Sequence, residues 1–141
     1  MILPDVNVLV YAHREDSAQH AACNAWLLRT LKEDQAFGLS EIVLSSVVRI
    51  VTHPKIFKQP TRLDVALAFT AGLLAQPHRV LVAPGPGHWE IFTKLCRDVD
   101  ARGNLIADAY LAALAIESGC EWVTTDGDFA RFPALKWRRP D

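Results

Sequence analysis

The chain has 141 residues, a formal net charge of −1 and 50% hydrophobic residues, which is enough apolar side chain for one packed core and argues against wholesale disorder. No run of about 18 apolar residues is present, so we expect no membrane-spanning helix, and the early Asp5 argues against a signal peptide. The three cysteines are far apart and form no C-x-x-C pair, which argues against a zinc site and a disulfide framework. We expect a single domain over residues 1–141 in a reducing cytoplasm.

The first half of the chain predicts alternating strands and helices. A short strand covers residues 2–5, and the apolar run at 6–12 either continues this strand or turns into a helix. Asp16 or Ser17 can cap a helix that runs to about residue 34. A strand at 36–39 follows, and Ser40 can cap a helix through residue 52, which Pro54 stops.

The second half continues the alternation. Thr61 and Asp64 form a T-x-x-D capping box for a helix that ends near residue 76, before a strand at 79–83 and a turn at 84–87. A helix from about residue 88 ends at Gly103, and another over 105–118 ends at Gly119. A strand at 121–125 and a short last strand from Trp137 complete the order. This order predicts an α/β fold whose parallel central sheet is covered by helices on both faces.

Three aspartates are the candidate site residues. Asp5 and Asp126 follow the first and fourth predicted strands, and ligands bind outside the carboxyl ends of strands in parallel sheets. Asp108 interrupts the otherwise apolar helix LIADAYLAALAI, which we expect to be buried all round. A buried carboxylate is costly unless it is paired or binds a metal ion. Hard oxygen ligands of this kind suit Mg²⁺ or Mn²⁺.

Basic side chains gather in one stretch. Residues 42–63 contain no acid but carry Arg49, Lys55, Lys58 and Arg62. These residues are candidates for binding a polyanion such as RNA. An ordinary solvated basic face is an equally good reading of the charge pattern alone.

Several segments together resemble one family. The segments LPDVNVLVYA, GNLIADAYLAALAIESG and WVTTDGDFARFP resemble PIN-domain nucleases, and more narrowly the VapC toxins of bacterial toxin–antitoxin pairs. The segment LSEIVLSSVVRIVTHPKIF is similar to one VapC subgroup. The resemblance implies a three-layer α/β/α fold, Mg²⁺-dependent endoribonuclease activity, a homodimer and a cognate VapB-type antitoxin.

The resemblance also assigns roles to residues. It places the family's acids at Asp5, Asp108 and Asp126, with Asp5 and Asp108 as the metal ligands. It makes Asn7 and Thr125 the polar residues that steady these carboxylates.

One position departs from the family pattern. Most members carry a glutamate inside the third helix, where this chain has Ser46. Glu41 lies near the start of that helix, and we expect it to reach the site, because a helix N-terminus favours an anion. Alternatively, Glu41 is a helix-start acid with no further role. The missing glutamate also supports an alternative function, a catalytically weak or inactive PIN-like module that binds RNA or protein.

Overall fold

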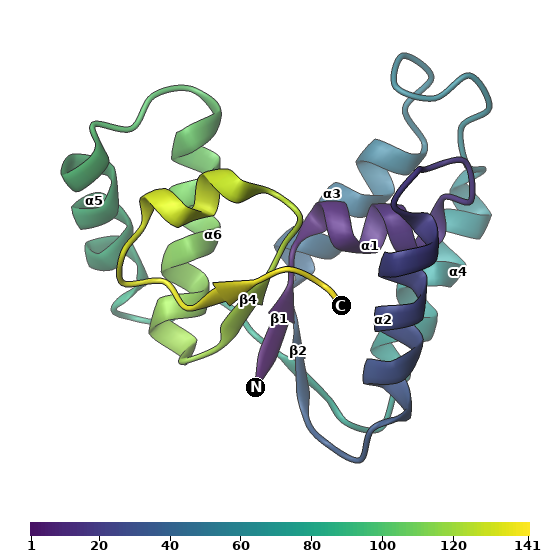
Figure 1. Cartoon of the computed structure of the whole chain (residues 1–141), viewed down its shortest axis with the longest axis horizontal. Coiled ribbons are helices and arrows are strands. Elements are labelled where there is room, and N and C mark those ends of the chain that lie inside the picture. The colour runs from purple at the N-terminus through teal and green to yellow at the C-terminus, as the bar shows by residue number, and fades with distance from the viewer.

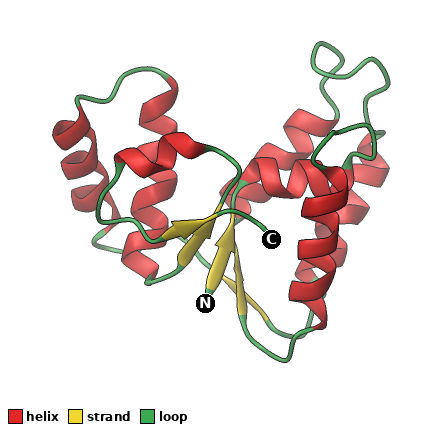
Figure 2. Ribbon diagram, in the orientation of Figure 1, coloured by secondary structure: helices red, strands yellow, loops and turns green.

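A parallel β-sheet runs through the centre of the computed structural model, which describes all 141 residues (Figure 1, Figure 2). One ladder has the strand order β1-β4-β5 and a second joins β2 to β3, and every pair is parallel. Strands β1 and β2 pack side by side, so the two ladders form one layer. The strands are β1 (Ile2–Pro4), β2 (Phe37–Leu39), β3 (Arg79–Leu81), β4 (Glu121–Val123) and β5 (Trp137–Arg138).

Helices cover both sides of this layer, which confirms the predicted three-layer α/β/α fold (Figure 1). On one side lie α1 (Val6–His13), α2 (His20–Lys32), α3 (Glu41–Val51) and α4 (Leu63–Leu74). On the other lie α5 (His88–Val99) and α6 (Asn104–Ser118), and the short 3-10 helix η1 (Gly127–Arg131) follows β4. None of the helices combines the length and the apolar character needed to cross a membrane.

The first strand tolerates a proline at the centre of the sheet. The Asp5 N–H donates to the Val123 carbonyl at 2.8 Å, so by the alternation of strand groups the Pro4 nitrogen faces β2 instead of β4. On that side β2 approaches through Gly38, where a Cβ would lie 3.2 Å from the Ile2 carbonyl oxygen. The missing N–H and this close approach explain why β1 and β2 pack together while their ladders remain separate.

Two predicted helix starts need correction. The helix α2 begins at His20, and neither Asp16 nor Ser17 caps it; the Ser17 hydroxyl accepts from the Gln19 N–H in the preceding turn. The predicted capping box is wrong as well, because α4 begins at Leu63. The Thr61 hydroxyl instead contacts the side chains of His13 and Arg14, so a tertiary contact overrides the local motif.

Two expectations for the second half also fail. The helix that begins at His88 ends at Val99 instead of Gly103, because Asp100 turns the chain with a left-handed φ of 49°. Gly103, with φ 57°, precedes α6 instead. The helix α6 is not buried all round: Ala112 is fully buried, but Ile106 in the first turns is 37% exposed.

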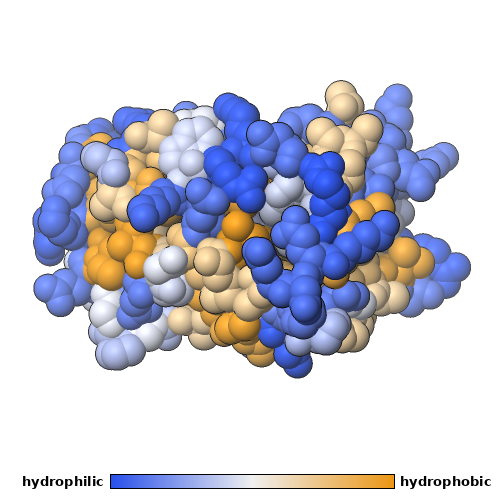
Figure 3. Space-filling model, turned by 60° about the horizontal axis from the view of Figure 1, so that its bottom comes forward, coloured by the Kyte–Doolittle hydropathy of each residue, from blue (hydrophilic) through white to orange (hydrophobic).

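The core contains 29 buried hydrophobic residues, and the largest of its fully buried side chains come from the last third of the chain: Trp122, Phe129 and Phe132. Apolar side chains also reach the surface in separate patches among charged ones (Figure 3). The large exposed apolar residues include Leu63 and Leu67 on α4, Leu81 on β3 and Trp89 on α5.

Substitution of Gly38 tests the close approach of β1 and β2. A Cβ at Gly38 would lie 3.1–3.2 Å from Val82, Ile2 and Leu3, so we expect Gly38→Ala to destabilise the fold by about 1–3 kcal/mol. The control is Gly72→Ala in α4, where no atom lies within 4 Å of the added Cβ. This control should stabilise the protein by about 0.5–1 kcal/mol. Urea unfolding of both variants provides the measurement, and equal stabilities would contradict the close packing.

Candidate active site

The carboxyl ends of β1 and β4 open into a cavity of about 500 Å³ between α1, α3 and α6. Asp5 follows β1, Asp108 projects from α6 and Asp126 follows β4, and all three aspartates line this cavity. Asn7 and Arg49 line it as well. The structure therefore brings together the three aspartates that the sequence places in separate segments.

Asp5 is the most constrained of the three. Asp5 is 5% exposed and caps the N-terminus of α1, with the Val6 N–H donating to its Oδ1 at 2.6 Å. The Thr124 hydroxyl donates to Oδ2 at 2.6 Å. The strand–helix junction thus fixes both carboxylate oxygens, which explains why the apolar run after Asp5 forms a helix and does not extend the strand.

Thr124 is a site residue that sequence reasoning missed. It is fully buried, and its Oγ1 also accepts from the Asp126 N–H at 3.0 Å, so one hydroxyl connects two of the aspartate positions. The available signal was the T-x-D spacing of Thr124 and Asp126. The predicted Thr125 contributes its backbone instead: its N–H donates to Asn7 Oδ1 at 3.5 Å, a long contact.

Asp126 also shapes the turn after β4. Its Oδ1 accepts from the Asp128 N–H at 2.9 Å and so caps η1. Asp126 is therefore the N-terminal capping residue of η1, and the backbone N–H of Asp128 is the donor of the capping hydrogen bond. One oxygen of Asp126 is held by the backbone, and the side chain still lines the cavity.

Burial and neighbouring carboxylates raise the pKa of two of the aspartates, Asp5 and Asp108. Burial, together with the charges of Asp108 and Asp126, raises the pKa of Asp5 from 3.8 to about 6, although the hydrogen bonds from Thr124 and Val6 oppose this shift. Burial and the charges of Asp126 and Asp128 raise the pKa of Asp108 from 3.8 to about 6. Ionising these groups together is therefore costly unless a cation lies among them.

The donor set fits a hydrated Mg²⁺. In this structure no group of three or more histidine, cysteine, aspartate or glutamate side chains is close enough to enclose a metal ion. Mg²⁺ keeps several of its waters and usually takes one or two carboxylates, so it does not require an enclosed set. Acid oxygens in a shared cavity, destabilised by their own repulsion, suit such an ion.

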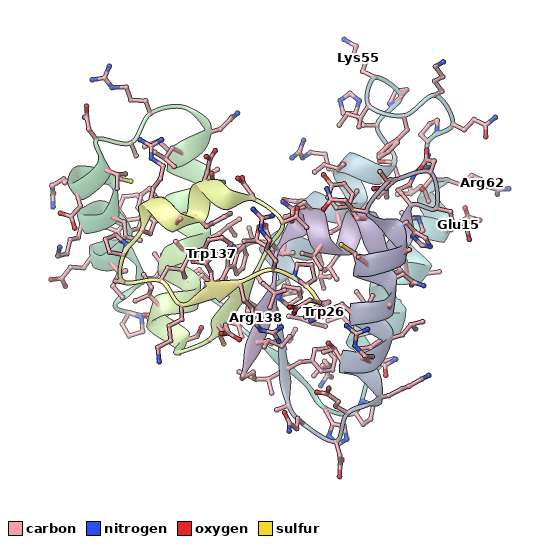
Figure 4. The ribbon with its side chains drawn as sticks, viewed as in Figure 1. Glu15, Trp26, Lys55, Arg62, Trp137 and Arg138 are labelled. Atoms are coloured by element: carbon pink, nitrogen blue, oxygen red, sulfur yellow. The ribbon has the colours of Figure 1, made fainter.

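Four other predicted site residues lie outside the cavity lining. Glu41 is exposed at the start of α3, so the structure does not bring it to the three aspartates, and its role stays a prediction. Lys55 and Arg62 project from the connection between α3 and α4 (Figure 4), and Arg62 pairs with Asp64 at 3.2 Å. Lys58 lines a separate polar pocket. Arg49 is the one lysine or arginine that lines the cavity.

The raised pKa values predict an unusual dependence of stability on pH in metal-free protein. Because the folded chain holds protons on Asp5 and Asp108 up to about pH 6, it binds more protons than the unfolded chain between about pH 4 and 6. The free energy of unfolding should fall as pH rises through this window. Asp108→Asn should weaken the dependence and stabilise the protein at pH 7 by about 1 kcal/mol, a value reduced because Asp108 is partly solvated.

Thermal unfolding in chelator, at pH 5 and pH 7, measures this effect. Added Mg²⁺ should stabilise the wild type at pH 7 and have little effect on Asp108→Asn. A variant less stable than the wild type at pH 7 would contradict the proposed repulsion.

Comparison with known proteins places the chain in a family. It matches the PIN domain family over residues 2–135. It is 45% identical to Ribonuclease VapC43 of Mycobacterium tuberculosis over an alignment of 140 residues. This alignment covers 99% of this chain and 95% of the relative. It is 42% identical to Ribonuclease VapC25 of the same organism, with 99% of each covered.

A solved structure supports the same fold. VapBC2 from Rickettsia felis, bound to a DNA fragment from their promoter, aligns with a TM-score of 0.72, 19% identity and full coverage of both chains. At that identity the likeness shows the fold alone, whereas the two ribonucleases are close enough to show the family. The chain therefore belongs to the PIN domain family and, within it, to the VapC ribonucleases.

Proposed function

We propose that the protein is a toxin endoribonuclease that hydrolyses RNA phosphodiester bonds with the help of Mg²⁺. The observation that carries this proposal is the shared cavity of Asp5, Asp108 and Asp126, in which burial and mutual repulsion raise two of the carboxyl pKa values. Kinship with the VapC ribonucleases supports RNA as the substrate.

Each carboxylate has a proposed role. Asp5 and Asp108 bind the ion, and Asp126 completes the negative site from the end of the neighbouring strand β4. Mg²⁺ supplies charge neutralisation at the scissile phosphate and lowers the pKa of a bound water; Mn²⁺ could serve in the same way. Thr124 keeps Asp5 in one orientation, so that its oxygens do not have to be ordered when substrate binds.

Arg49 is the proposed phosphate contact inside the cavity. It lines the cavity, and no ion-pair partner for it occurs in the structure, so its guanidinium is available to RNA. Lys55, Lys58 and Arg62 are exposed on the connection after α3 and would attract the RNA backbone from outside.

The proposed partners follow from the family. We propose a homodimer and a VapB-type antitoxin as the partners, with the cytoplasm as the location. The exposed apolar side chains on α4, β3 and α5 support the presence of contact surfaces. The whole chain, residues 1–141, would act as one PIN domain.

RNA cleavage with and without metal tests the proposal. Purified wild-type protein should cleave total RNA in Mg²⁺ and lose this activity in chelator. Asp108→Asn and Asp126→Asn should each lower the rate at least about 100-fold, because each removes a charge that holds or orients the ion.

The matched control is Asp98→Asn on α5, where the aspartate pairs with Lys94 away from the cavity. It should cleave at the wild-type rate. Cleavage that persists in chelator or in Asp108→Asn would overturn the mechanism, and RNA binding without cleavage would favour the inactive binding module. Glu41→Gln decides the open role of Glu41: a fall in rate would support a place in the site, and an unchanged rate would exclude it.

A further inference from the structure

Apolar side chains also line the cavity that contains the aspartates. They include Val10 and Tyr11 of α1, Ile50 of α3, and Ile56 and Phe57 from the connection between α3 and α4, and these five residues form its apolar wall. Metal binding and phosphate contact use none of these side chains. An apolar wall beside a phosphate-binding site is suited to contact an apolar part of the same substrate.

Phe57 is held firmly at this wall. The backbone N–H of Phe57 donates to the His53 carbonyl at 3.1 Å. The guanidinium carbon of Arg14 lies 4.0 Å from the centre of the Phe57 ring, a cation–π contact. The same arginine donates to the Gln59 carbonyl at 2.8 Å and to the Thr61 hydroxyl at 3.2 Å, so it ties the connection to the end of α1.

The arginine itself is fixed and cannot readily serve as an RNA contact. Its side chain is 11% exposed and pairs with Asp16 at 2.7 Å. Arg14 lines a polar pocket to which Phe57 does not contribute, and Phe57 lines the catalytic cavity to which Arg14 does not contribute. Arg14 therefore contacts the Phe57 ring without lining the cavity that contains the aspartates.

We propose that Phe57 is a stacking platform for an unpaired RNA base next to the scissile phosphate. This proposal rests on the proposed ribonuclease function. The base must be unpaired, because a base inside a helix is already stacked and cannot reach the ring.

The geometry favours a base over other occupants. The ring lies in the same cavity as the three aspartates, so a phosphate held at the acids keeps its neighbouring base within reach of the wall. The volume of about 500 Å³ lies within the range of about 300–1,000 Å³ found for small-molecule sites, and it is large enough for a nucleotide. Tyr11 offers a second aromatic surface on the same wall. Aromatic stacking tolerates any base, so Phe57 contributes affinity and position rather than strict sequence choice.

The test uses the fluorescence of 2-aminopurine, which stacking on an aromatic ring quenches. The probe is a short unstructured RNA in which the adenines are replaced by 2-aminopurine, and binding is followed in the cleavage-deficient Asp108→Asn background with Mg²⁺. Phe57→Leu keeps an apolar side chain but removes the ring, so it should abolish the quenching and weaken binding roughly tenfold. Phe57→Trp should restore both.

The matched control is Phe69→Leu. Phe69 packs on His13 with ring centres 4.8 Å apart and does not line the catalytic cavity, so the substitution should leave quenching and affinity unchanged. In the background with Asp108 intact, Phe57→Leu should raise KM for the RNA and change kcat less.

The outcomes separate this proposal from the ribonuclease proposal. Equal quenching and affinity in Phe57→Leu and its parent would overturn the stacking role, even if the wild type cleaves RNA. Quenching that disappears in Phe57→Leu and fails to return in Phe57→Trp would also overturn it, because a disturbed loop and not the ring would then be responsible. A wild type that never cleaves RNA would overturn the function instead, and quenching that depends on Phe57 would still support the platform.

Discussion

The structure depends on the position of one buried carboxylate at the junction of β1 and α1. Asp5 ends the central strand, caps the helix that follows without an intervening loop, and accepts the Thr124 hydroxyl from the neighbouring strand end. Asp5 also lines the cavity shared with Asp108 and Asp126. A side chain that secures the fold thus also builds the site, which limits how far the site can vary without a cost in stability.

Burial and the repulsion between its carboxylates determine the chemistry of the site. Ionised acids that are buried and have raised pKa values destabilise a folded chain on its own. A divalent cation bound among them removes this cost. At the position of the family's mid-helix glutamate, Ser46 lines the cavity, and Arg49 lines it one helical turn further along α3. The residues that α3 contributes to the cavity lining therefore include no acid, and the acids of the lining are the three aspartates.

The sequence predicted much of this arrangement, for physical reasons that also explain the failures. Alternating strands and helices indicated the parallel sheet, and Asp5 and Asp126 could be placed at its carboxyl edge because chain direction determines that edge. Asp108 was conspicuous because it interrupts an apolar helix. Thr124, Phe57 and the contacts of Arg14 with the connection after α3 were missed, since they depend on residues that lie 43 or more positions apart in the chain. The end of α5 was placed too late in the chain, because Asp100 adopts a left-handed φ that its residue type does not demand.

Proton release on metal binding tests the central claim most directly. Isothermal titration of Mg²⁺ into the protein, in buffers with different ionisation enthalpies, counts the protons displaced. If Asp5 and Asp108 share a cation site and titrate near pH 6, binding at about pH 6 should release protons, and the release should vanish towards about pH 8. Asp108→Asn should bind more weakly and release fewer protons. Binding at pH 6 without proton release, or with equal strength in Asp108→Asn, would contradict a carboxylate site built around one ion.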